Sequence, residues 1–102
     1  MKNLRTKKAE RLRKIRAERL KALAHPTRLL FFEALEQGEK CVGDLQALVD
    51  ADFSTVSRHL ARLKQAGLVR WEKRGNQVVY SLTAPCLDPF LRCLDNLEVQ
   101  DA

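Results

Sequence analysis

The chain has 102 residues, of which 45% are hydrophobic, and its formal net charge is +6. This length is too short for two independent cores and the hydrophobic fraction argues against wholesale disorder, so we expect one domain over residues 1–102. No apolar run approaches the roughly 20 residues of a membrane span, and the basic start lacks the apolar segment of a signal peptide, so we expect a cytoplasmic protein without a membrane partner.

The charge is unevenly distributed along the chain. Residues 1–21 carry ten Lys or Arg against two acids, and residues 54–74 carry six against one. Residues 76–102 hold four acids and a single Arg. Two basic segments and an acidic end suggest a polyanionic partner, although a merely soluble surface explains the charge alone about equally well.

A first helix is predicted over about residues 5–24, because this segment lacks Gly and Pro and repeats Leu and Ile at helical intervals. We expect residues 1–10 to form a basic arm that frays at its start, since a terminus without packing partners frays. One alternative for this segment is a membrane-surface or RNA-binding arm, but its basic side chains are spread around the helix, which disfavours membrane docking. Our hypothesis is that the arm strengthens nonspecific affinity for DNA.

Three further helices are predicted before residue 68. The first begins at Pro26, whose missing N–H is harmless in a first turn, and ends at Gly38. A short helix follows over about residues 42–49, and the next has Asp52 as its N-cap and Gly67 directly after its end. Because only a few residues separate these last two helices, the pattern predicts a helix-turn-helix.

The helix after Asp52 has an apolar face and a face of small polar and basic residues. Val56, Leu60 and Leu63 recur at helical spacing and are predicted to face the core. Small hydroxyls and arginines on the opposite face are the side chains that reach base edges and phosphates in a major groove. On the flank, His59 is expected to have a structural or phosphate-contacting role rather than to bind a metal. The predicted DNA-contacting residues of this helix are Ser54, Thr55, Ser57, Arg58, His59 and Arg62.

A β-hairpin is predicted next, because Gly75 and Asn76 form a two-residue turn signal between alternating segments. Folding about this turn predicts the facing pairs Val69–Leu82, Trp71–Tyr80 and Lys73–Val78.

A basic hairpin directly after a reading helix predicts the wing of a winged helix, which would follow the neighbouring DNA backbone or minor groove. The alternative is an exposed helix followed by a solvated hairpin; charge, hydroxyl placement and hairpin position agree in favouring DNA. The predicted DNA contacts of the wing are Lys73, Arg74, Asn76 and Gln77.

A last helix is predicted within residues 84–102, beginning near Pro85 or Pro89. The apolar stripes of the first and last helices exceed what one chain of about 100 residues needs to cover, which predicts a homodimer. Such a dimer would present two reading helices to successive major grooves about one helical turn apart. The expected dimer-interface residues are Leu12, Ile15, Leu23, Phe90, Leu91, Leu94 and Leu97.

Four segments in combination resemble the ArsR/SmtB family of winged-helix repressors: LKALAHPTRLLFFEAL, CVGDLQALV, STVSRHLARLKQAGLVR and RGNQVVYSLT. The resemblance extends over about residues 20–97 without gaps. It implies a mainly α winged helix-turn-helix, with about five helices and a two-stranded wing, in a homodimer joined through the first and last helices. It also implies a repressor that binds a palindromic operator and releases it on sensing an inducer, often a metal ion.

Cys41, Cys86 and Cys93 are the candidate soft-metal ligands, and their odd number without secretory context favours reduced thiols over a disulfide framework. Cys41 resembles the first cysteine of the family's arsenic-sensing C-x-C arrangement, but Gly43 stands where the second would be. The last helix also lacks the histidines of the family's zinc site.

Thiolate softness favours trivalent arsenic or antimony, or Cu(I), as the inducer over hard ions. One alternative is a thiol switch that responds to oxidants or sulfide, and another is that all three cysteines are small buried hydrophobes. No cofactor is expected for DNA binding itself.

An enzyme is not expected, because no Ser/His/acid or Cys/His arrangement has a plausible partner and no Gly-rich phosphate loop occurs. The remaining rival is a winged-helix module that binds DNA without any ligand. The two readings differ in whether an inducer lowers the affinity for operator DNA.

Overall fold

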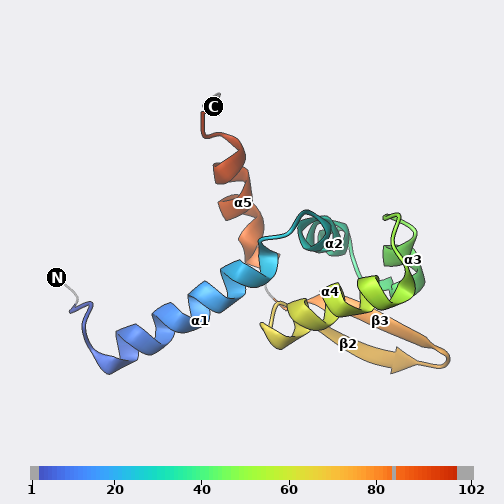
Figure 1. Ribbon diagram of the computed structural model, residues 1–102, viewed down its shortest axis with the longest axis horizontal. Helices are drawn as coiled ribbons and strands as arrows, with labels where there is room; N and C mark the ends of the chain where they lie inside the picture. The colour runs from blue at the N-terminus through green and yellow to red at the C-terminus, as the bar shows by residue number, and fades with distance from the viewer. Residues whose placement is uncertain (1–2, 84, 99–102) are drawn as a thin grey trace.

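The computed structural model describes residues 3–83 and 85–98. In these residues the chain forms a winged helix-turn-helix, which confirms the predicted fold class (Figure 1). No helix among them is both long enough and apolar enough to cross a bilayer. The elements in chain order are α1 (Lys7–Leu23), α2 (Pro26–Glu36), β1 (Lys40–Cys41), α3 (Val42–Gln46), α4 (Phe53–Gln65), β2 (Val69–Arg74), β3 (Gln77–Leu82), η1 (Pro85–Leu87) and α5 (Asp88–Asp95).

The helix boundaries follow from local capping. The Thr6 side chain accepts a hydrogen bond from the backbone N–H of Ala9, so residues 7–10 of the predicted arm belong to α1. The Asp52 carboxylate accepts from the backbone N–H of Thr55 at 2.8 Å and caps α4, as predicted. After α4, Gly67 adopts a φ of 78°, a left-handed conformation that other residues rarely take.

Two local features differ from the sequence-based prediction. Helix α3 ends at Gln46, three residues earlier than expected, because the following residues form turns in which Leu48 and Val49 each bond three residues back. Strand β1 was not predicted, since a strand of two residues shows no periodicity. It pairs antiparallel with β3 and completes a sheet of order β1-β3-β2.

The β2–β3 hairpin has the predicted register. Its turn contains Gly75, with a φ of 61°. The three expected facing pairs are all present: Val69–Leu82, Trp71–Tyr80 and Lys73–Val78.

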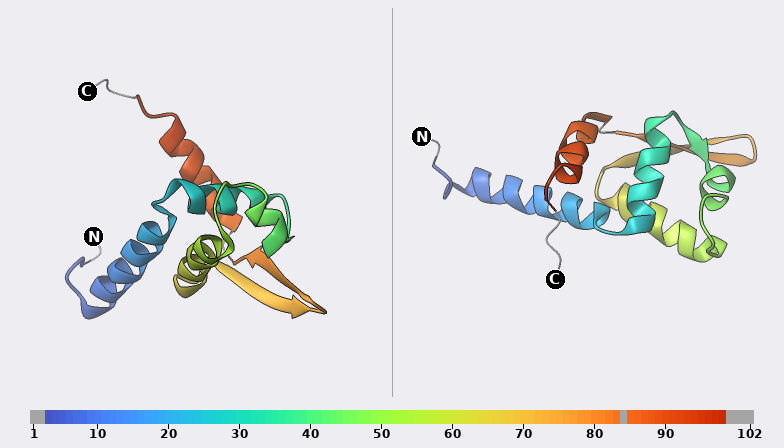
Figure 2. Two further views of the ribbon diagram at one scale, coloured as in Figure 1. Left: turned by 45° about the vertical axis from the view of Figure 1, so that its right-hand side comes forward. Right: turned by 90° about the horizontal axis from the view of Figure 1, so that it is seen from above.

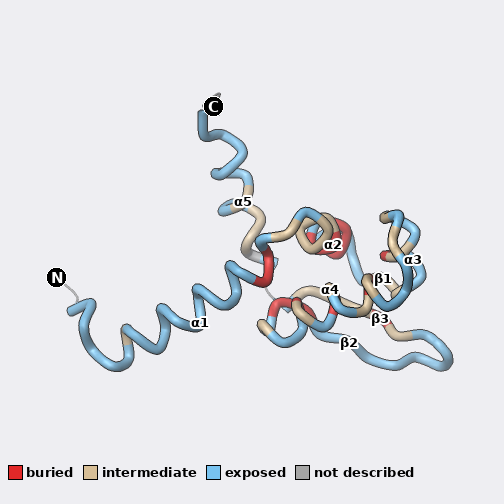
Figure 3. Tube along the Cα trace, viewed as in Figure 1, coloured by how far each residue is buried: buried red, intermediate tan, exposed pale blue. Residues whose placement is uncertain are grey.

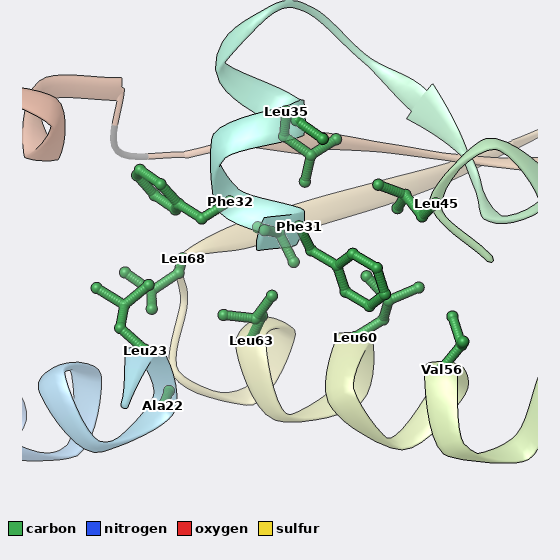
Figure 4. Close-up of a cluster of buried hydrophobic side chains, with 12 residues drawn as sticks. Ala22, Leu23, Phe31, Phe32, Leu35, Leu45, Val56, Leu60, Leu63 and Leu68 are labelled. Atoms are coloured by element: carbon green, nitrogen blue, oxygen red, sulfur yellow. The ribbon is translucent and has the colours of Figure 1, made fainter. Parts of the chain in front are cut away.

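A core of apolar side chains lies between α2, α3 and α4. In Figure 4 the labelled side chains of α4 point toward those of α2, with Leu45 of α3 beside them. Each such side chain contributes on the order of 1.5–3 kcal/mol on burial. The largest fully buried residues are Phe31, Phe32, Leu45, Val56, Leu60 and Leu63.

A polar bridge joins α1 and α2 to α4 beside this core. Arg28 donates through Nε to the carbonyl of Ala22 at 2.6 Å, and its second nitrogen lies 3.4 Å from Nδ1 of His59. The ring centroids of His59 and His25 are 4.4 Å apart. Burial, followed by the nearby positive charge of His25 and Arg28, lowers the pKa of His59 below its usual value. Because a guanidinium only donates, Nδ1 of His59 accepts, which requires a neutral ring.

The last turns of α1 also hold α4. Arg19 donates through Nε to the carbonyl of Ala66 at 3.1 Å, at the C-terminal end of α4. Glu18 lies 3.7 Å from a guanidinium nitrogen of Arg62 on the same helix. The first turns of α1 project away from the body of the domain, and residues there are exposed (Figures 2 and 3).

We expect Leu60→Ala to lower the free energy of unfolding by about 2–5 kcal/mol, because it opens a cavity in the core. The matched control is Leu48→Ala, at a position that is 46% exposed, which should cost less than about 1 kcal/mol. Urea denaturation followed by circular dichroism measures both, and equal losses would show that α4 does not pack as described.

The lowered pKa of His59 also predicts a pH dependence. The unfolded chain binds a proton at this residue more readily than the folded chain, so stability decreases as the pH falls below about 6.5. Urea midpoints at pH 7.5 and 5.5 should therefore differ more for the parent than for His59→Asn, which keeps an acceptor but does not titrate. An equal decrease in both proteins would contradict this assignment.

Candidate nucleic-acid interface

The outward face of α4 carries polar and basic side chains at its leading end. Ser54 and Arg58 are exposed and Thr55 is half-buried, opposite the fully buried stripe that contains Leu60. Ser54 Oγ donates to the Asp52 carboxylate at 3.3 Å, and Arg58 donates to Thr55 Oγ1 at 3.3 Å. These bonds order the first turns of α4 while the remaining guanidinium N–H groups of Arg58 stay available to a ligand.

Asp52 is an acid at this otherwise polar and basic end. Hydrogen bonds from Thr55, with a further one from Ser54, lower the pKa of Asp52 below its usual value. The carboxylate therefore stays ionised at neutral pH and remains a strong cap for the leading turn.

The other candidate residues of α4 lie on its flanks. Ser57 is half-buried. His59 turns toward α2, where it meets Arg28, and Arg62 turns toward Glu18 of α1. The structure therefore brings Ser54, Thr55 and Arg58 together on one outward face and places His59 and Arg62 beside the neighbouring helices.

The tip of the wing lies at the same end of the molecule as the start of α4, in Figure 1 and in the right view of Figure 2. At its base, Lys64 Nζ of α4 stands 4.7 Å from the ring centroid of Trp71 on β2, which ties the hairpin to the helix. Lys73, Asn76 and Gln77 are exposed, and their side chains have no hydrogen-bond or ion-pair partner among the described residues. They are therefore available to a nucleic-acid backbone beside the groove that α4 would enter.

Arg74 differs from the other wing candidates. Its guanidinium bonds to the carboxylates of both Glu39 and Glu72. Sequence reasoning missed this because Glu39 is 35 residues away and precedes a strand that was not predicted.

The candidate cysteines are separated in the fold. Cys41 is half-buried at the start of α3, and Cys93 is exposed on α5. These two segments lie on opposite sides of α2 in Figures 1 and 2, and the side chain of Cys86 lies outside the described residues. Within residues 3–83 and 85–98, no three His, Cys, Asp or Glu side chains are grouped closely enough to hold a metal ion. The expected three-thiolate site includes Cys86 and therefore stays a prediction.

Most residues expected at a dimer interface are exposed in the single chain. Leu23 differs from this expectation. It is 5% exposed in the single chain and packs in the core with Leu68, because α1 ends against α4 there. Leu91 is half-buried against the same core. An open groove of about 480 Å³ lies between α1 and α5, lined in part by Leu20 and Phe90. The exposed members of the set are Leu12, Ile15, Phe90, Leu94 and Leu97.

Comparison with known proteins agrees with this geometry. Residues 25–70 match the profile described as "Bacterial regulatory protein, arsR family". The chain is similar to the HTH-type transcriptional regulator Rv0081 of Mycobacterium tuberculosis, with 38% identity over 84 residues, 81% of this chain and 74% of that protein. It is also similar to the biofilm growth-associated repressor of Agrobacterium fabrum, with 43% identity over 63 residues, 62% of this chain and 54% of that protein.

Solved structures share the fold. The homodimeric winged helix-turn-helix DNA-binding domain of Mb0332 from Mycobacterium bovis superposes with a TM-score of 0.81 at 25% identity, over 90% of this chain and 88% of that one. The transcriptional repressor BigR from Xylella fastidiosa gives a TM-score of 0.74 at 30% identity, over 89% of this chain and 96% of that one. With a matching profile over the helix-turn-helix, and 38% identity to a regulator of which it covers 74%, this chain belongs to the arsR family of bacterial regulatory proteins.

Proposed function

We propose that this protein is a homodimeric transcriptional repressor that binds double-stranded operator DNA in the cytoplasm through α4 and the wing. The observation that carries the proposal is the division of α4 into a fully buried face and an outward face that ends beside the wing. Arg58 on that face has the geometry to contact guanine or phosphate, and Ser54 and Thr55 are short enough to let the helix approach base edges.

The exposed apolar side chains of α1 and α5 support the dimer. Residues such as Phe90, Leu94 and the 63%-exposed Leu97 are costly to leave in water, and a second copy would cover them. The related Mb0332 domain is homodimeric. A two-fold dimer carries two copies of α4, so its operator should be a palindrome with half-sites about one helical turn apart.

We further propose that an inducer releases the operator by acting on cysteine thiols. Cys41 connects the sheet to the helix-turn-helix: its backbone N–H bonds to the Asp44 carboxylate at 3.3 Å, and it pairs with Val79 of β3. Gly43 of α3 is the neighbour of the Cys41 side chain: a Cβ built on Gly43 would lie 3.9 Å from Sγ, an ordinary van der Waals separation. Modification at this position would therefore disturb α3 and the wing together.

The inducer we favour is trivalent arsenic or antimony, because both are soft and thiophilic. Binding through three thiolates needs Cys86 or cysteines of a second copy. Cys41 and Cys93 supply only two thiolates, and the segments that carry them lie on opposite sides of α2. The alternative is a thiol switch sensitive to oxidants or sulfide, which the exposure of Cys93 favours. A repressor without an inducer is the remaining case.

Arg58→Ala should weaken binding to the operator by about 1–3 kcal/mol while leaving the fold intact. The matched control is Arg92→Ala, which removes a cation that is also exposed, on α5, and should leave affinity unchanged. Fluorescence anisotropy with a duplex selected from a random library by the parent protein measures both. Equal affinity of Arg58→Ala and the parent would show that this face does not read DNA, and failure to select any duplex would reject the proposed function.

The inducer proposal predicts that arsenite or antimonite releases the duplex under reducing conditions and that Cys41→Ser abolishes the release. Zn(II), Cu(I) and an oxidant are tested in parallel. Release by the oxidant alone would replace the metalloid with the thiol switch, and binding that no agent disturbs would reject cysteine sensing altogether.

A further inference from the structure

Arg74, at the end of β2, is held by two carboxylates from different parts of the chain. Its two terminal nitrogens bind the two Glu39 oxygens at 2.5 and 3.0 Å, a bidentate pair. Its Nε donates to the Glu72 carboxylate at 2.7 Å, and one terminal nitrogen donates to the same oxygen. All three guanidinium nitrogens are therefore engaged within the protein.

The charge of this cluster does not suit a direct contact with phosphate. One guanidinium and two carboxylates sum to a net charge of −1. Hydrogen bonds from Arg74 lower the pKa of Glu39, so that carboxylate is ionised at neutral pH. A DNA phosphate that approached Arg74 would meet both carboxylates, whereas Lys73, the preceding residue, has no acidic partner among the described residues.

The cluster spans the whole three-stranded sheet. Glu39 directly precedes β1, and Arg74 ends β2 on the far side of β3. In the same sheet Cys41, Val79 and Glu72 are in register across the three strands. Val79 lies on the central strand β3 and is 9% exposed. Since β1 contributes only two residues of pairing, the ion cluster adds a polar side-chain link between the wing and the segment that leads into α3.

We propose that Arg74 is a positioning residue for DNA binding, which with Glu39 and Glu72 clamps the wing to the start of the helix-turn-helix and does not itself neutralise a phosphate. This inference rests on the proposed function. Because one carboxylate already orders the Arg74 side chain, binding the second carboxylate costs little further side-chain conformational entropy. A single exposed ion pair lacks this advantage.

Two substitutions separate a clamp from a phosphate contact. Glu39→Gln removes a negative charge near the wing, so a phosphate-contacting Arg74 would bind DNA more tightly in this variant. If Arg74 acts as a clamp, the loss of its bidentate partner instead weakens the binding of DNA by the protein about threefold to tenfold. Arg74→Lys keeps the positive charge but cannot form the fork, so the clamp predicts a similar loss and a phosphate contact predicts nearly parental affinity.

The experiment measures affinity for the selected duplex at fixed salt for the parent, Glu39→Gln, Arg74→Lys and the double variant. The clamp predicts that the double variant binds no more weakly than the weaker single variant, because both break the same cluster. Lys73→Ala is the matched control: it should weaken binding and lower the slope of log affinity against log salt by about 0.9, and its effect should add to that of Glu39→Gln. Tighter binding by Glu39→Gln, or parental affinity of Arg74→Lys, would overturn the proposal.

Amide hydrogen exchange without DNA tests the clamp independently of the proposed function. Exchange of the β3 amides should increase at least about threefold in Glu39→Gln and Arg74→Lys but not in Lys73→Ala. Unchanged exchange in the first two variants would overturn the clamp even if DNA binding is confirmed. Faster exchange in a protein that selects no duplex would support the clamp and reject only the proposed function.

Discussion

The burial of one face of α4 is the constraint on which the rest of this structure depends. Val56, Leu60 and Leu63 are fully buried against α2, with Leu45 of α3 beside them. Rotating the helix about its axis would expose this stripe to water and bring Arg58 into an apolar core, at a cost of many kcal/mol. The apolar stripe therefore determines which side chains face outward, where the polar residues are free to serve the proposed function without contributing to the core.

Contacts outside the core fix the position of α4 more finely. Arg28 connects the end of α1 to His59, and Arg19 donates to the carbonyl of Ala66 at the end of α4. The same helix α1 carries the exposed side chains Leu12 and Ile15, so it connects the proposed dimer surface to the proposed reading helix. The proposed inducer would need only about 1–3 kcal/mol of coupling along this connection to change the affinity for DNA.

Features that depend on neighbouring residues were predicted from the sequence, whereas features that depend on contacts between distant segments were not. The cap at Asp52 and the turn at Gly75 are signals within a few residues, and both helix and hairpin were predicted correctly. The length of α3, the strand β1 and the pairing of Arg74 with Glu39 depend on segments that meet only in the folded chain. Leu23 belongs to an apolar stripe that continues along α1, and only the packing of α1 against α4 shows that the stripe enters the core there.

Among the candidate DNA contacts, exposure and partners divided residues that looked alike in the sequence. Arg58 and Arg74 are both exposed arginines in a basic segment, yet one bonds only to a hydroxyl of its own helix and the other to two carboxylates. His59 similarly has a protein partner in Arg28. A basic segment in a sequence therefore indicates a candidate DNA-binding surface. Which of its cations are free to contact DNA depends on the protein groups that each one bonds to in the fold.

The most direct test of this account is the change in backbone amide NMR shifts when the selected duplex is added to the isotopically labelled protein. The largest changes should fall on the leading turns of α4, around Ser54, Thr55 and Arg58, and on the wing at residues 73–77. The buried residues Val56, Leu60 and Leu63 should change less than their outward neighbours. Changes centred on α5 or on the first turns of α1, with α4 undisturbed, would contradict the central claim that the outward face of α4 reads DNA.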